Sequence, residues 1–263
     1  MKLARCTVAL LTLPLLGHDL YLMPRRFRPA AGSTITIALH NGDDFPDPDR
    51  APKAENLLDV SLHGAKGSTP MRNLRTEGKV LLADVTVAAG SSLLSVRTKP
   101  NFIELQPVKF EDYLRHEGLT HVLRWRAEHN ESAMAGRERY SKYVKSLVVA
   151  GTPTDFYHHP VGYPIEIIPA ADPASVKVGA ELPIQVMFRG KPAADVQIEM
   201  AWLPPNGKAT RQAAGRTDGE GRLKIPIGSP GIWKLHTVLM ERCAEPSVAD
   251  WESFWSSFTF EVQ

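Results

Sequence analysis

His18 is the residue with the most evident chemistry, because it follows directly on a stretch built like a secretory leader. Residues 1–17 carry Lys2 and Arg5 near the start, then an apolar run, and end at the small residue Gly17. This order is typical of a signal peptide, and the run is too short to span a bilayer. Cleavage after Gly17 would make His18 the first residue of the mature chain. Its α-amine and its imidazole could then chelate a transition metal through two nitrogens.

Three further histidines are candidate ligands because of their places on predicted strands. His40, His63 and His236 lie on strand faces opposite the apolar residues of the same strands, where side chains meet solvent or a neighbouring domain. Two of them converging on His18 would complete a T-shaped three-nitrogen site of the kind that copper favours, or an open nitrogen-rich site for nickel. The alternative for each is an ordinary surface histidine. The candidate metal ligands are therefore His18, His63, His40 and His236.

Composition limits the cellular compartments and the classes of partner that fit this chain. Removing Lys2 and Arg5 with the leader leaves 29 basic residues against 29 acidic ones, so the mature chain is neutral. Neutrality argues against a nucleic-acid partner and gives no electrostatic reason to bind a membrane surface. Cys6 would leave with the leader, and Cys243 alone cannot form an intramolecular disulfide. We expect a soluble protein of a Gram-negative periplasm, with no integral membrane span.

Most of the chain shows the period-two alternation of strands. Ile35, Ile37 and Leu39 share one strand face, and similar short runs separated by turn residues recur to the C-terminus. This pattern predicts a mainly β protein of two tandem β-sandwich domains of the immunoglobulin or transthyretin type. We place them at 18–152 and 164–263, joined by a proline-rich linker at 153–163.

One segment breaks the strand pattern. Between 109 and 131 apolar residues recur at helical spacing, and Gly118 divides the segment. We predict two short helices inserted into the first domain, covering an edge or end of its sandwich. The chain has no glycine-rich phosphate loop, no Gly-x-Ser-x-Gly elbow and no paired cysteines, so we expect a non-catalytic binding protein without an organic cofactor.

Several motifs resemble one family along nearly the whole mature chain. They are His18-Asp19-Leu20-Tyr21-Leu22-Met23-Pro24, Phe110-Glu111-Asp112-Tyr113-Leu114, Gly136-Arg137-Glu138-Arg139-Tyr140-Ser141-Lys142-Tyr143, Gly190-Lys191-Pro192, Thr217-Asp218 and Asp250-Trp251-Glu252-Ser253. Together they resemble the bacterial periplasmic family of unknown function associated with nickel and cobalt uptake, the NikM-like group. The resemblance implies nickel or cobalt as the metal and an envelope transporter component as partner. Some members carry a histidine at the position where this chain has Leu239.

The sequence therefore predicts a periplasmic protein that binds nickel or cobalt, with copper as a further candidate, and assists metal uptake or homeostasis. Metal affinity should fall below about pH 6.5, because protons compete for the imidazole. The main alternative is a structural or interaction module of the envelope, binding a glycan or a protein and no metal. A smaller alternative is a copper redox enzyme built on a histidine brace.

Overall fold

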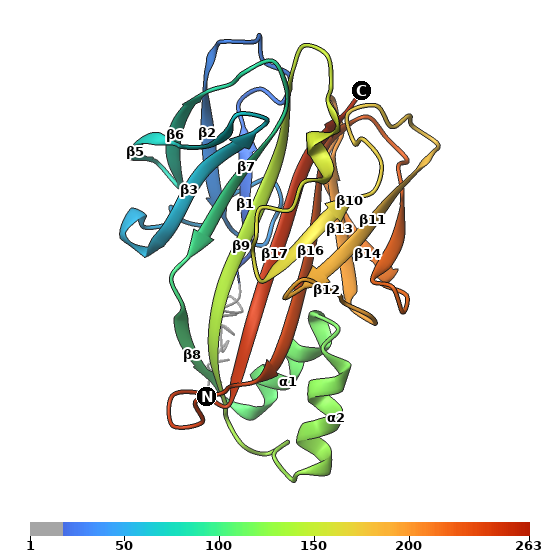
Figure 1. The fold of residues 1–263 in the computed structure, drawn as a ribbon. Coiled ribbons are helices and arrows are strands. Elements are labelled where there is room, and N and C mark those ends of the chain that lie inside the picture. The colour runs from blue at the N-terminus through green and yellow to red at the C-terminus, as the bar shows by residue number, and fades with distance from the viewer. Residues whose placement is uncertain (1–17) are drawn as a thin grey trace, which may run out of the picture.

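The computed structural model describes residues 18–263, so the predicted signal peptide at 1–17 lies outside the described residues. The fold is mainly β, with three sheets and two helices in this part of the chain, and the predicted fold class is confirmed (Figure 1). Neither of these helices is long and apolar enough to cross a membrane.

The largest sheet runs through the centre of the molecule. In spatial order its strands are β14 (Thr210–Arg216), β13 (Gln197–Leu203), β16 (Gly231–Arg242), β17 (Trp251–Val262), β9 (Gly136–Ala150), β7 (Gly90–Thr98), β3 (Leu57–Gly64) and β4 (Gly67–Pro70), with β8 (Asn101–Leu105) also paired to β9. The pairing of β9 with β17 is parallel, whereas the other neighbours are antiparallel. Figure 1 shows these two long strands side by side at the middle of the fold. One continuous sheet therefore contains strands from both sides of the predicted boundary at 153–163.

Two smaller four-stranded sheets complete the sandwich packing. One contains β1 (Leu20–Pro24), β2 (Thr34–Asn41), β6 (Val80–Thr86) and β5 (Arg72–Glu77); the other contains β10 (Ile165–Pro169), β11 (Glu181–Phe188), β12 (Lys191–Pro192) and β15 (Arg222–Pro226). Strand β9 serves both cores: Val144 and Val148 pack with the first sheet, while Leu147 and Val149 pack with the second. Because both faces of β9 are covered, every residue from Ser141 to Ala150 is buried, the polar ones included.

The predicted linker is fixed to the central sheet. It contains the short 3₁₀ helix η2 (Asp155–His158), and a second one, η1 (Ala54–Asn56), precedes β3. Glu166 on β10 accepts backbone N–H bonds from Val161, Gly162 and Tyr163 at 2.9–3.1 Å, and the ammonium of Lys145 on β9 lies 2.7 Å away. The two halves of the chain are thus joined by a shared sheet and by a buried ion pair.

The two helices predicted within 109–131 are present. They are α1 (Pro107–His116) and α2 (Thr120–Glu128), separated at Gly118, whose φ of +67° suits glycine. Their apolar side chains pack on Val238, Trp251 and Trp255 of β16 and β17. The helices therefore cover strands from the end of the chain as well as the first half. Strand β1 lies on the same face of the central sheet, where the hydroxyl of Ser257 donates to the carbonyl of Leu20.

Replacing Gly136 with alanine is expected to lower the free energy of unfolding by about 1–3 kcal/mol, as overpacking of a core does. A Cβ at Gly136 would lie 2.3 Å from the ring of Phe110, which α1 packs against the start of β9. Denaturant unfolding measures the change. Gly219→Ala is the matched control, since a Cβ at Gly219 meets nothing within 4 Å. Equal effects of the two substitutions would contradict this packing of α1.

Candidate metal centre

The pairing of β1 with β2 decides what lies beside His18. In this antiparallel pair Leu20 faces Asn41, so the residues before β1 lie next to the residues after β2. The amide of Gly42 donates to the carbonyl of Asp19 at 2.9 Å, and the amide of Asp19 lies 3.3 Å from Oδ1 of Asp43. The start of the described chain is thereby held against the loop that follows β2.

This acidic loop, residues 42–49, folds back on the end of β2. The amide of Asp49 donates to the carbonyl of Asn41 at 2.9 Å. Gly42 allows the close approach, because a Cβ there would lie 2.8 Å from the nitrogen of Asp49. His40 also stabilises the loop, because its Nδ1 lies 2.9 Å from the carbonyl oxygen of Pro46. The fold-back carries the carboxylates of Asp43 and Asp49 to the same place.

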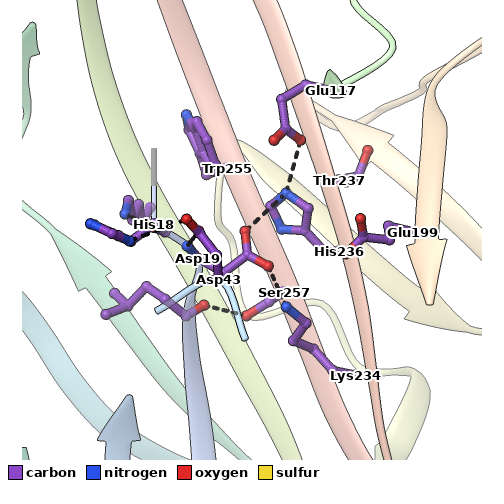
Figure 2. A network of polar contacts seen from close by, with 12 residues as sticks. His18, Asp19, Asp43, Glu117, Glu199, Lys234, His236, Thr237, Trp255 and Ser257 are labelled. Atoms are coloured by element: carbon purple, nitrogen blue, oxygen red, sulfur yellow. Dashed lines mark hydrogen bonds and ion pairs between the residues drawn. The ribbon is translucent and has the colours of Figure 1, made fainter. Parts of the chain in front are cut away.

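His18, Asp43 and Asp49 form the candidate centre. Nδ1 of His18 lies 3.3 Å from Oδ2 of Asp43 and 3.0 Å from Oδ2 of Asp49, and the three potential ligand atoms all lie within 4.8 Å of one another. His18 is 5% exposed, and within residues 18–263 its Nδ1 makes no hydrogen bond despite these short distances. Figure 2 shows its ring beside Asp43. A buried ring nitrogen thus faces two carboxylate oxygens without being hydrogen-bonded to either.

These spacings suit a shared divalent transition metal. Metal–nitrogen and metal–oxygen bonds of about 2.1 Å separate adjacent ligand atoms by about 3.0 Å in octahedral geometry and about 3.4 Å in tetrahedral geometry. Imidazole with carboxylates is a donor set used by zinc, nickel, copper and iron. Three ligand atoms from side chains leave further coordination positions open.

The other three predicted ligands do not join this group. His40 binds the Pro46 carbonyl, and Nε2 of His63 lies 2.8 Å from the hydroxyl of Ser95 on β7. His236 is buried, 3.3 Å from both Asp19 and Glu117. Among residues 18–263, the one cluster of three or more potential ligands is that of His18 with two aspartates, so no three-histidine set is assembled there.

A buried charged network supports the residue next to His18. Asp19 contacts the ammonium of Lys234 and lies 3.3 Å from Nε2 of His236, which in turn lies 3.3 Å from Glu117 (Figure 2). Burial opposes the charge of Asp19, but His236 and Lys234 together hold its pKa well below the usual range. Burial also disfavours a charged His236, whereas Asp19 and Glu117 outweigh it and raise the pKa of that ring. Opposite charges therefore balance around the start of β1.

A second buried acid lies under the helices. Glu138 on β9 is 2% exposed; Tyr113 donates to it at 3.1 Å, and Ser253 donates to the same oxygen. Burial raises the pKa of Glu138 from 4.5 to about 7, despite these hydroxyl donors. The folded protein therefore binds a proton here that the unfolded chain releases near pH 4.5.

The shift at Glu138 predicts a loss of stability as the pH rises. The folded state keeps the proton up to about pH 7, so the contribution is full below pH 4.5 and disappears as the pH passes through 7. A shift of this size corresponds to about 3 kcal/mol. The variant Glu138→Gln, which cannot ionise, should lack this part of the pH dependence in denaturant unfolding between pH 5 and 8. A constant difference between variant and wild type across that range would refute the assignment.

Comparisons with known proteins place the chain in a family. Residues 15–241 match the family model described as Domain of unknown function (DUF4198). The chain belongs to the DUF4198 family. No curated protein matches the sequence.

Two solved structures illustrate the structural matches. One holds the three N-terminal domains of the highly immunogenic outer capsid protein Hoc of bacteriophage RB49, at 11% identity, covering 94% of this chain and 59% of that chain, with a TM-score of 0.19. The other is dimeric latent PorU from Porphyromonas gingivalis, at 12% identity, covering 93% of this chain and 20% of that chain, with a TM-score of 0.21. This DUF4198 chain thus spans less than two thirds of either structure.

Proposed function

We propose that this DUF4198 protein binds nickel or cobalt in the periplasm through His18, Asp43 and Asp49, as a non-catalytic accessory to metal uptake. The observation that carries the proposal is the buried Nδ1 of His18, which faces two carboxylate oxygens at 3.3 and 3.0 Å without a hydrogen bond. The lone pair of a neutral imidazole would repel these oxygens, and a protonated Nδ1 would pair with them without the geometry of a hydrogen bond. A cation between the three atoms turns that repulsion into coordination.

The ring nitrogen involved also fits a processed N-terminus. Nδ1 is the nitrogen that can close a six-membered chelate ring with the α-amine of the same residue. Cleavage after Gly17 would free that amine and add a second nitrogen ligand to the two carboxylates. The mature centre would then offer two nitrogens and two oxygens, with positions left open for exchange of the metal.

The donor set favours the binding of nickel or cobalt over the redox chemistry of a copper histidine brace. A histidine brace needs a second imidazole beside the first, and the described residues bring aspartates to His18 instead. Two carboxylates and a nitrogen pair suit nickel and cobalt, which accept six mixed nitrogen and oxygen ligands. The resemblance to the nickel- and cobalt-associated group adds an envelope transporter component as the proposed partner.

Mass spectrometry followed by calorimetric titration tests the proposal. The periplasmic protein should have the mass of a chain that begins at His18. It should bind Ni(II) or Co(II) with a dissociation constant of about 1 μM or less, and His18→Ala should weaken binding at least about tenfold. His158→Ala, at an exposed histidine, is the matched control and should bind as the wild type does. A chain that gives no binding heat with Ni(II), Co(II) or Cu(II) would contradict the proposal and favour an envelope interaction module.

A further inference from the structure

A cavity of about 440 Å³ adjoins the candidate metal centre. His18 forms part of its wall, together with the segment that follows the acidic loop, the turn after β7, and β9. The charged and aromatic side chains of its lining are His18, Arg50, Lys53, Lys99, Tyr140 and Lys142. We refer to it as the basic cavity.

The charged side chains in the wall of the basic cavity are all positive. Among the described residues, four cationic side chains line the basic cavity and no aspartate or glutamate does. The four are Arg50, Lys53, Lys99 and Lys142, and none of them takes part in an ion pair within the described chain. Cations gathered around a concave surface attract anions, because each repels the others until an anion neutralises them.

Lys142 links the basic cavity to the metal centre. It is 8% exposed, and its ammonium donates to the carbonyl oxygen of His18. The same ammonium lies 5.6 Å from the ring centre of Tyr140 and 5.4 Å from that of Trp255. An ammonium has three donors, and one backbone carbonyl leaves two of them for another acceptor.

We propose that the basic cavity binds a small polycarboxylate that also coordinates the metal held by His18, Asp43 and Asp49. The inference rests on the proposed function, since the metal is one of the two partners of the ligand. Asp43 and Asp49 neutralise a divalent ion, which leaves the four cations of the cavity to be balanced by the ligand. One carboxylate occupies the open metal positions, and the others pair with the cationic side chains. The protein would then take up its metal as an anionic chelate.

Equilibrium dialysis with nickel citrate tests this inference, with nickel and citrate measured separately. Wild type should retain both in equal amounts, and Arg50→Gln/Lys53→Gln should bind citrate at least about tenfold more weakly, because two charge-assisted contacts are lost. Binding of Ni(II) alone should not weaken in this variant, since neither side chain is a ligand. Lys177→Gln/Lys191→Gln removes two exposed lysines far along the sequence and should behave as wild type.

The outcomes separate this inference from the proposed function. Retention of nickel without citrate by wild type would overturn the polycarboxylate and leave the metal centre standing. Equal citrate binding by wild type and by the Arg50→Gln/Lys53→Gln variant would overturn the basic cavity as its site. Failure to retain nickel from either free Ni(II) or nickel citrate would contradict the proposed function, and this inference with it.

Discussion

Replacing Lys234 with methionine is expected to lower the free energy of unfolding by about 3–5 kcal/mol, as the loss of one partner of a buried ion pair does. Lys234 is fully buried, and its ammonium contacts the carboxylate of Asp19, which is also buried. Without that ammonium, His236 would be the one cationic side chain of residues 18–263 within 4 Å of Asp19, with Glu117 nearby. Denaturant unfolding at pH 7 measures the change.

A surface pair provides the control for Lys234. Lys224 lies 3.2 Å from Glu181, but both side chains are more than half exposed, so Lys224→Met should change stability by less than about 1 kcal/mol. The double variant Lys234→Met/Asp19→Asn should recover part of the loss, because the unpaired carboxylate is then removed as well. Similar small effects of Lys234→Met and Lys224→Met would show that the buried network does not stabilise the start of β1.

Replacing both Asp43 and Asp49 with asparagine is expected to weaken nickel binding at least about 100-fold. Changes to groups that only orient ligands commonly cost 10- to 100-fold in metal affinity, and this variant removes two charged ligands. Asparagine keeps the size of each side chain and cannot supply the negative charge that faces Nδ1 of His18. Calorimetric titration with Ni(II) measures the loss.

The same loop supplies the control for the two aspartates. Asp44→Asn/Asp47→Asn removes the same charge from residues that do not belong to the cluster around His18. This variant should bind nickel within a few-fold of wild type, since only the long-range attraction is lost. Equal losses in the two double variants would indicate that the loop attracts cations by its charge alone, without a defined centre.

Local sequence patterns predict the elements of this fold better than their assembly. Alternation identifies strands such as β2 and β11, and the helical spacing around Gly118 identifies α1 and α2. The parallel pairing of β9 with β17 has no local signal, because the two strands are about a hundred residues apart in the chain. That pairing merges the two predicted sandwiches into one continuous central sheet.

The candidate metal centre, like the sheet, depends on contacts between distant parts of the chain that local sequence patterns do not predict. Alternation correctly separates His236 from the apolar face of β16, but it does not reveal that β1 and the helices cover the other face and bury His236. His18 is identified by its place after the leader-like stretch. Its partners Asp43 and Asp49 are visible in the sequence as an acidic run, and only the register of β1 on β2 brings that run to His18.

We propose that one metal ion binds between His18, Asp43 and Asp49. A crystal structure of the processed protein grown with Ni(II), with anomalous scattering recorded at the nickel absorption edge, tests it most directly. We predict one strong anomalous peak about 2.1 Å from Nδ1 of His18 and from one carboxylate oxygen of each aspartate. An anomalous map without a peak at these three residues, or with its main peak at His158 and His159, would contradict the account.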